Sequence, residues 1–213
     1  MKKAIVLLSG GLDSSTTLYH AKSRGYDCRA LIFEYGQKHS RELKSAAAIA
    51  RLTKTPYRIM KIKLPWGGSA LISKRRQCAL SPFVGKKGIP PTYVPARNTI
   101  FISFALSYAE AIGADAIFIG ANAIDYSGYP DCRPEYYKAL QVLIKKGLRD
   151  RHIKIVTPLI KMTKAQIIKL ARKLDVPLEI TWSCYKGGKK PCGTCDSCRL
   201  RDKGFAEAGL TNI

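Results

Sequence analysis

The sequence predicts an α/β fold: a doubly wound, mostly parallel sheet of five strands with a small helical tail at the C-terminus. Short apolar runs alternate with helical patterns along most of the chain, and right-handed crossovers then place the strands parallel in one sheet. The 213 residues, 46% of them hydrophobic, suffice for one substantial domain with an appendage. We therefore expect an α/β domain over residues 1–180 and a C-terminal segment over residues 181–213.

The first part of the chain is expected to contribute three strands and two helices. The first strand is expected in the continuous apolar run of residues 3–8, as in strands that a parallel sheet buries on both faces. Two further strands are expected over residues 28–35 and 57–64. Ser14 is a candidate N-cap for the first helix, and Gly25 would end it. The second helix is expected over residues 39–55, before Pro56.

Residues 65–95 interrupt this alternation with prolines, glycines and basic residues that follow no sustained period. A loop of this length in a compact domain is commonly a cover over an active site, so we expect a substrate lid. Thr163 is a suitable cap for a later helix. After the lid, helices are expected over 97–113, 134–146 and 163–175, and strands over 115–122 and 152–159.

The chain is strongly basic, with 37 lysines and arginines against 15 acidic residues and a formal net charge of +22. Nucleotides, phosphates and RNA all fit such a surplus, and a basic, solvated surface without a partner fits it as well. The basic residues are spread along the chain, which does not favour a nucleic-acid arm. The N-terminal apolar run is too short for a signal peptide or a membrane span, and we expect a cytoplasmic protein.

The first expected strand leads into "LSGGLDSS", residues 8–15, a stretch that suits a phosphate site. Its glycines allow close backbone approach, the following helix points its N-terminus at the ligand, and the serines add hydroxyl donors. The stretch lacks the lysine of G-x-x-x-x-G-K-[ST] and the third glycine of G-x-G-x-x-G. It resembles S-G-G-x-D-S, the pyrophosphatase-type ATP loop, in which ATP is cut between its α and β phosphates. Asp13 is then a candidate Mg²⁺ ligand; the alternative is a turn that binds nothing.

Four of the seven cysteines lie close together near the C-terminus, in the pattern C-x7-C-x2-C-x2-C. In a cytosolic chain such a group is more typical of a metal site than of disulfides. Four thiolates complete the tetrahedral coordination of Zn²⁺ and leave no open position, so the site would be structural. An iron–sulfur cluster and a redox pair from "CGTC" are the alternatives. The candidate ligands are Cys184, Cys192, Cys195 and Cys198.

Several motifs together resemble the 7-cyano-7-deazaguanine synthase family of the queuosine and archaeosine pathways. They cover essentially the whole chain: "LSGGLDSSTTL", "EYGQKH", "VPARN", "GANAIDYSGYPDCRPEY", "TPLIKMTKAQI" and the cysteine tail. Within this set "DYSGYPDCR" and the cysteine tail are the specific ones. The resemblance implies an adenine-nucleotide α-hydrolase-like, Rossmann-like fold and a homodimer. It also implies a ligase that forms C–N bonds and uses ATP and Mg²⁺, with Zn²⁺ in the tail.

The implied reaction converts 7-carboxy-7-deazaguanine and ammonia into 7-cyano-7-deazaguanine. The carboxylate attacks the α-phosphorus of ATP to form an acyl adenylate, which ammonia converts into an amide. A second ATP adenylates the amide oxygen, and loss of AMP leaves the nitrile. Orientation and charge stabilisation are the main demands that this chemistry makes on a protein. No glutaminase domain is evident, so free ammonia is the expected nitrogen donor; neither a membrane nor a nucleic acid is an expected partner.

The resemblance also implies which side chains bind the reactants. ATP would contact the loop and the head of a later helix, through Leu8, Ser9, Gly10, Gly11, Leu12, Asp13, Ser14, Ser15, Thr16, Thr17, Leu18, Arg97 and Asn98. The deazapurine would contact Tyr35, Gln37, Tyr126, Asp131 and Arg133, with His39 on the same rim. Family members often have Asp or Asn where Glu34 stands, so no role is assigned to that side chain.

The implied catalytic residues are Asp13, Lys164 and Arg133. Lys164, and more loosely Lys161, could neutralise charge that develops on the phosphates, while Arg133 could fork onto a carboxylate. Structural interpretations stay open beside these roles. Tyr126 and Tyr129 would pack their loop, Arg133 would cap the next helix, and His39 would donate at a helix N-terminus.

Two other functions remain open. A tRNA-modifying thiolase with the same ATP loop would adenylate a base oxygen and use the basic surface as a tRNA footprint. Such an enzyme needs a catalytic cysteine, for which Cys132 in the substrate loop is the candidate. A zinc-stapled nucleotide- or RNA-binding module would use the phosphate loop only as a sensor. Of the remaining cysteines, Cys28 is expected in the core and Cys78 in the lid.

Overall fold

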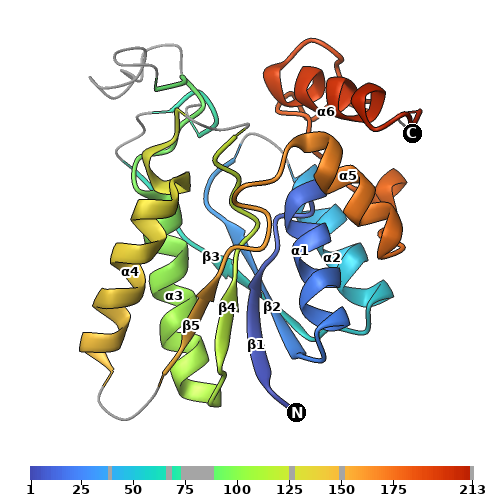
Figure 1. The fold of residues 1–213 in the computed structure, drawn as a ribbon. Helices are drawn as coiled ribbons and strands as arrows, with labels where there is room; N and C mark the ends of the chain where they lie inside the picture. Colours follow the sequence, from blue (N-terminus) through green and yellow to red (C-terminus); the bar gives the residue numbers. More distant parts are fainter. Residues whose placement is uncertain (38–39, 66–68, 73–88, 125–127, 149–151, 212–213) are drawn as a thin grey trace.

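The structure, a computed structural model, describes residues 1–37, 40–65, 69–72, 89–124, 128–148 and 152–211. Its centre is a five-stranded sheet with the strand order β3-β2-β1-β4-β5, and all of its strand pairs are parallel (Figure 1). The predicted fold class is confirmed. The strands are β1 (Lys3–Leu7), β2 (Asp27–Glu34), β3 (Tyr57–Lys61), β4 (Ala116–Phe118) and β5 (Lys154–Val156).

The central strand β1 accounts for the continuous apolar run near the start of the sequence. It pairs with β2, where Lys3 lies opposite Asp27, and with β4, where Ala4 lies opposite Ala116. Ala4 and Ile5 point to opposite faces and are both 0% exposed, because helices cover the sheet on both sides. The run is therefore apolar without alternation.

Helices lie on both faces of the sheet, as a doubly wound fold requires (Figure 1). On one face Ile102 of α3 and Ile144 of α4 join the core, and on the other face Leu18 of α1 and Ile49 of α2 do so. The helices are α1 (Leu12–Ser23), α2 (Arg41–Leu52), α3 (Arg97–Ile112), α4 (Pro134–Gly147), α5 (Lys164–Lys173) and α6 (Asp196–Glu207). Short 3-10 helices occur at Pro130–Cys132 and Leu178–Ile180.

The C-terminal helix α6 rests on the same side of the molecule as α1 and α5 (Figure 1). Phe205 of α6 is 1% exposed and packs in an apolar cluster with Leu12 of α1 and Ile167 of α5. The tail is thus helical, as predicted, and shares a core with the helix that follows the phosphate loop. The division of the chain at residue 180 stays a prediction.

The first helix begins earlier than predicted. Gly11, not Ser14, is the N-cap of α1, and the Ser14 hydroxyl donates back to the Gly11 carbonyl over 3.2 Å. The cause is the turn at Gly10, whose φ of +81° lets the chain leave β1 and enter the helix at once. The other end agrees with the prediction: α1 stops just before Gly25, which has a φ of +80°.

The cap of α5 is as predicted. The Thr163 side chain accepts a hydrogen bond from the Gln166 N–H, and the Gln166 side chain accepts one from the Thr163 N–H, so the two form a capping box. This fixes the start of α5, which carries Lys164. No helix among the described residues combines the length and apolarity that crossing a bilayer demands.

Candidate active site

A pocket opens at the carboxyl ends of the central strands. Strand order reverses between β1 and β4, and ligands of open parallel sheets bind at such a switch point. The cavity has a volume of about 240 Å³, and its walls come from the phosphate loop, from the ends of β2 and β4, and from the C-terminal segment. The sequence prediction of a site at the end of the first strand therefore falls on an actual cavity.

Neighbouring elements hold the phosphate loop in place. A Cβ atom on Gly10 would lie 2.5 Å from the Glu42 carbonyl oxygen and would also clash with the Ala46 backbone, so only glycine fits there. The Gly10 carbonyl accepts hydrogen bonds from the Ser45 hydroxyl at 2.7 Å and from the Trp182 N–H at 2.9 Å. Helix α2 and the C-terminal segment thus both fix the conformation of the loop.

The end of β4 closes the loop from another side. A Cβ atom on Gly120 would lie 2.9 Å from the Asp13 carbonyl oxygen and 3.0 Å from the Ser14 nitrogen. A larger residue would push the first turn of α1 away from the sheet. The glycine in "FIGAN" is therefore part of the site architecture, although its sequence context alone did not single it out.

Only part of the predicted ATP-contact stretch forms pocket wall. The Thr16 and Thr17 hydroxyls donate to the Leu12 and Asp13 carbonyls at 2.8 and 2.9 Å, so they serve the helix. Gly10, Ser15 and Leu18 also lie outside the lining. The wall residues from this stretch are Leu8, Ser9, Gly11, Leu12, Asp13 and Ser14, and the predicted Arg97 and Asn98 join them.

Asp13 and Lys164 form an ion pair inside the pocket. The Lys164 Nζ donates to both carboxylate oxygens of Asp13, at 2.8 and 2.9 Å. The lysine and aspartate side chains are 9% and 16% exposed. The lysine that is missing from the loop is thus supplied by the N-terminus of α5, and the structure brings together two residues that the sequence predicted separately. Lys161, by contrast, is exposed and lies outside the pocket lining.

Helix α6 supports this lysine. A Cβ atom on Gly204 would overlap the Lys164 Cγ and lie 2.8 Å from its Cβ, so the stem of Lys164 lies directly against the α6 backbone. Arg201, one turn earlier, is buried and donates to the Leu178 carbonyl and the Thr181 hydroxyl at 3.0 and 2.7 Å. Arg201 also lines the pocket.

Tyr35, Gln37 and Arg97 build the wall beyond the end of β2. An Arg97 nitrogen donates to the Tyr35 hydroxyl at 3.2 Å. The Gln37 side chain accepts from the Tyr35 N–H at 2.8 Å and donates to the Phe33 carbonyl at 3.1 Å. Burial raises the pKa of Tyr35, against the opposing effect of Arg97, so the phenol stays protonated. All three predicted residues line the cavity.

Asp131 and Arg133 lie outside the pocket lining. The Asp131 carboxylate accepts the Asn98 N–H at 3.1 Å and so caps α3, while its carbonyl accepts from the Asn98 side chain at 3.1 Å and from the Tyr137 hydroxyl at 2.9 Å. Arg133 is exposed and is the N-cap residue of α4. Their contacts with a deazapurine stay predictions, and Arg133 occupies the N-cap position of α4 without a side-chain capping hydrogen bond.

The cysteines outside the tail differ in setting. Cys28 is 3% exposed and belongs to the core, as predicted. Cys132 lines the pocket, but burial raises the pKa of its thiol to about 12, and a protonated thiol is a poor nucleophile. Cys78, together with Tyr126, His39 and most of the predicted lid, lies outside the described residues.

Several pocket residues were missed by sequence reasoning. Glu42 stands in the first turn of α2, and the others come from the substrate loop and the tail. One signal could have found Glu42: the N-terminus of a helix that follows a strand of a parallel sheet faces the ligand edge. The tail residues carry no such signal, because they reach the pocket only through the tertiary packing of the C-terminal segment. The pocket residues without a predicted binding role include Glu42, Tyr129, Trp182, Ser183, Tyr185, Ser197 and Arg201.

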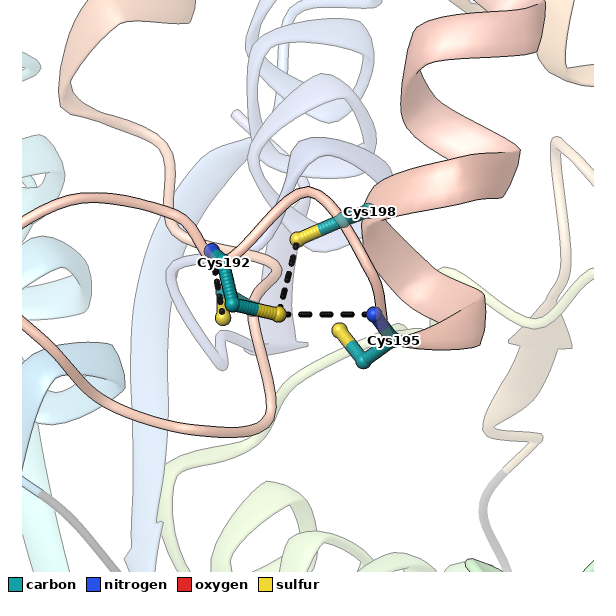
Figure 2. Close-up of side chains that lie close together, drawn as sticks. Cys192, Cys195 and Cys198 are labelled. Atoms are coloured by element: carbon teal, nitrogen blue, oxygen red, sulfur yellow. Dashed lines mark hydrogen bonds between the residues drawn. The ribbon is translucent and has the colours of Figure 1, made fainter.

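The tail cysteines form a candidate metal centre. Cys184, Cys192, Cys195 and Cys198 place their sulfur atoms within 4.8 Å of one another, and Figure 2 shows the labelled thiols turned toward a common point. The Cys192 and Cys198 sulfurs are 4.0 Å apart, close to the edge of about 3.8 Å that a tetrahedron with Zn–S bonds of about 2.3 Å requires. All four are free cysteines.

Local donors favour thiolates at this centre. The backbone N–H groups of Lys186 and Cys192 point at the Cys184 sulfur, each at 3.4 Å. Hydrogen bonds from Thr194 lower the pKa of the Cys192 thiol, whereas burial raises the pKa of the Cys198 thiol to about 12. N–H donors compensate part of the negative charge that four thiolates bring together. The donor set and its spacing therefore fit a closed, tetrahedral metal site.

Comparison with known proteins agrees with this geometry. The family model described as "Queuosine biosynthesis protein QueC" matches residues 3–209. Proteins named 7-cyano-7-deazaguanine synthase share 52% identity in Nostoc punctiforme and 51% in Thermoplasma volcanium. The two alignments cover 99% of this chain, with 97% of the Nostoc and 89% of the Thermoplasma protein.

Solved structures of similar fold come from more distant proteins. The NMN synthetase of Francisella tularensis has a TM-score of 0.54 at 17% identity, over 99% of this chain and 78% of its own. The U34-tRNA thiolase NcsA of Methanococcus maripaludis, solved with its [4Fe-4S] cluster, has a TM-score of 0.51 at 19% identity, over 95% and 65%. These likenesses concern the fold, whereas the family match spans nearly the whole sequence. The chain belongs to the family of the queuosine biosynthesis protein QueC.

Proposed function

We propose that this ligase-type enzyme makes 7-cyano-7-deazaguanine from 7-carboxy-7-deazaguanine and ammonia, with ATP as the activating substrate. The observation that carries the proposal is the Asp13–Lys164 pair, at 2.8 Å, in a pocket at the head of the phosphate loop. It joins a candidate cation ligand to a candidate phosphate ligand at the position where a nucleotide would be cleaved. The names of the close relatives supply the product, 7-cyano-7-deazaguanine.

The phosphate loop is proposed to hold the departing pyrophosphate. Ser9 and Ser14 share a hydroxyl–hydroxyl hydrogen bond of 3.0 Å at the pocket wall, and the Gly11 N–H and the N-terminus of α1 lie beside them. Phosphate oxygens accept from such donors and from a helix N-terminus. Lys164 would then turn from Asp13 to the phosphates and stabilise the charge that develops when the α–β bond breaks.

Mg²⁺ is proposed to bind with the nucleotide through Asp13. Its carboxylate lies at the pocket wall, as a hard-cation ligand should, and both of its oxygens already face a positive charge. The ion would neutralise phosphate charge when bound. Lys164 keeps Asp13 neutralised before the nucleotide arrives, so the pair is stable in the empty pocket.

The carboxylate substrate is proposed to lie between the loop and the wall of Tyr35, Gln37 and Arg97. This wall offers a guanidinium that can attract the substrate carboxylate toward the α-phosphorus. Tyr126, Asp131 and Arg133 remain proposed contacts of the deazapurine from the loop after β4. The chemistry itself needs orientation and charge stabilisation, which a buried pocket provides.

Zn²⁺ is the proposed occupant of the cysteine centre. Cys184, Cys192, Cys195 and Cys198 would hold it, and it would supply no chemistry beyond fixing the tail, because four thiolates leave no open position. We also propose a homodimer and a cytoplasmic location, where reducing conditions keep such thiols available. Metal analysis of the purified protein separates zinc from iron, which would bring visible absorption.

The test is a complete reaction followed by mass spectrometry. Purified protein is incubated with ATP, ammonium and 7-carboxy-7-deazaguanine, and AMP and the nitrile are measured. Formation of both is expected, with none when the carboxylate is omitted. If no AMP appears with this substrate, the proposal is wrong. AMP formed with a tRNA instead would favour the thiolase function.

A further inference from the structure

Glu42 is an acidic side chain in the pocket that the proposed reaction has not used. It stands in the first turn of α2 and lines the cavity. Its backbone carbonyl lies against Gly10 of the phosphate loop, at the position where a Cβ on that glycine would clash. Glu42 is thus next to the loop that is proposed to hold the phosphates.

The other acidic groups around the site are already bonded. The Asp13 carboxylate accepts both of its hydrogen bonds from Lys164, and the Asp131 carboxylate accepts the Asn98 N–H. Among the described residues, none forms a hydrogen bond or ion pair with the Glu42 side chain, and Glu42 and Asp13 are the only carboxylates in the pocket lining. Glu42 is partly exposed, and a carboxylate that is partly withdrawn from water without a bonded partner is unfavourable, so a ligand with a positive charge or N–H donors fits there.

The surroundings of Glu42 limit its chemistry. Arg97 on α3 and Tyr35 after β2 are the charged and titratable groups whose electrostatic interaction with it is appreciable, and the paired Asp13 and Lys164 lie on the phosphate side of the same pocket. Burial raises the pKa of Glu42 to about 7, against the opposing effect of Arg97. A carboxylate with such a pKa can accept a proton at neutral pH and release it again.

We propose that Glu42 binds the ammonium ion and accepts a proton from it before the nitrogen attacks. This inference rests on the proposed function. Ammonium is the one cation among the substrates of that reaction, since ATP and the deazaguanine carboxylate are anions. The carbon that it must reach carries the adenylate, one oxygen away from the phosphorus, and Glu42 adjoins the phosphate loop. The N–H donors of the deazaguanine are on its pyrimidine edge and at the pyrrole nitrogen, and none of them adjoins that carbon.

One proton passes from ammonium to the Glu42 carboxylate, which leaves neutral ammonia and a carboxylic acid. The nitrogen lone pair attacks the carbonyl carbon, the C–N bond forms, and the bond from carbon to the AMP oxygen breaks. AMP leaves with that electron pair, the nitrogen loses a second proton to solvent, and Glu42 returns its own proton to solvent.

Glu42→Gln tests the inference, with Glu110→Gln on the exposed face of α3 as the matched control. Exchange of pyrophosphate into ATP that depends on 7-carboxy-7-deazaguanine, without ammonium, reports adenylation alone. We expect this exchange to be unchanged in Glu42→Gln, whereas kcat/KM for ammonium falls on the order of 100-fold, as for loss of a general base. The wild-type dependence of kcat/KM for ammonium on pH should show an apparent pKa near 7 that the variant loses.

Two further measurements separate a chemical role from a fold defect. Hydroxylamine is neutral at pH 7 and needs no base, so Glu42→Gln should form hydroxamate at the wild-type rate. Glu42→Asp, which keeps a carboxylate, should recover part of the ammonium activity. A Glu42→Gln protein that loses the exchange reaction, or whose KM rises for the deazaguanine or ATP with ammonium unaffected, overturns the inference in favour of a substrate contact. Absence of exchange in the wild type would overturn the proposed function, and this inference with it.

Discussion

The phosphate loop and the cysteine segment reach the same pocket by different routes. The loop builds its part from neighbouring residues: Gly10 turns, Gly11 caps α1, and Ser14 bonds back to Ser9. The cysteine segment, residues 181–213, lies far along the chain from the loop. Its Trp182 N–H nevertheless donates a hydrogen bond to the Gly10 carbonyl at 2.9 Å. One region therefore carries its chemistry in a short motif, while the other contributes through packing.

The two regions meet at Lys164. Its amine pairs with Asp13 of the loop, and its stem lies on Gly204 of α6, the helix that begins next to Cys195. A metal that fixes the cysteines would then also fix the surface on which the lysine rests. A metal bound by these cysteines would therefore influence the position of Lys164, the proposed catalytic lysine, without touching the substrate.

The largest effect is expected where the two regions join. Lys164→Met keeps an apolar stem against Gly204 but removes the charge, and we expect adenylation to fall on the order of 100- to 1,000-fold, as for loss of a group that stabilises transition-state charge. Pyrophosphate exchange measures it. The matched control is Lys169→Ala on the exposed face of α5; equal losses in both would show that the pair is structural.

The second-largest effect is expected from removal of the metal, which should change both the cysteine segment and the phosphate loop. Chelation, or Cys195→Ser, is expected to lower the melting temperature because metal binding is coupled to folding of its segment. ATP binding, measured by calorimetry, should weaken as well, since α6 then no longer supports Lys164. Addition of Zn²⁺ to the chelated wild type should restore both properties. If the metal-free protein binds ATP with unchanged affinity, the cysteine segment does not influence the phosphate site, and the prediction is wrong.

A smaller change tests the contact itself. Gly204→Ala should displace the Lys164 stem and cost about 1–3 kcal/mol of stability, as overpacking does, together with a higher KM for ATP. Gly147→Ala at the end of α4 is the control, because a Cβ there meets nothing within 4 Å. Denaturant unfolding and initial rates give the two values. If Gly204→Ala and Gly147→Ala have the same free energy of unfolding and the same KM for ATP, the contact between Gly204 and Lys164 has no role in stability or ATP binding.

The smallest effect is expected at Cys132. Its thiol, with a pKa raised to about 12 by burial, stays protonated at neutral pH, so Cys132→Ser should keep the wild-type rate of nitrile formation. The same assay as for the wild type measures it. If the Cys132→Ser protein is folded but inactive, Cys132 takes part in the chemistry. That result would favour the thiolase function over nitrile formation.

Much of the fold could be predicted because its signals are local. The continuous apolar run of residues 3–8 predicted the buried strand β1, Thr163 predicted the start of α5, and the cysteine spacing predicted the candidate metal centre. The cap of the first helix was predicted wrongly, at Ser14, because the positive φ of Gly10 depends on the close approach of α2. A local propensity cannot include a constraint from another element.

The site was predictable only in part, for the same reason. Asp13 and Lys164 were each expected at the phosphates, but their pairing joins residues 151 positions apart. Asp131 was expected at the substrate, and the structure uses its carboxylate on Asn98 at the start of α3. Glu42 belongs to no recognised motif, and its proposed role follows from its place in the pocket, where no described residue bonds its side chain; only the assembled pocket reveals this.

The central claim is that the substrate carboxylate attacks the α-phosphorus of ATP in this pocket. Transfer of the carboxylate oxygen to AMP is its most direct test. The substrate 7-carboxy-7-deazaguanine is labelled with ¹⁸O at both carboxylate oxygens, and the products are analysed by mass spectrometry. The account predicts two AMP molecules for each nitrile, each with one labelled oxygen, and unlabelled pyrophosphate. Unlabelled AMP, or ADP with labelled phosphate, would contradict it.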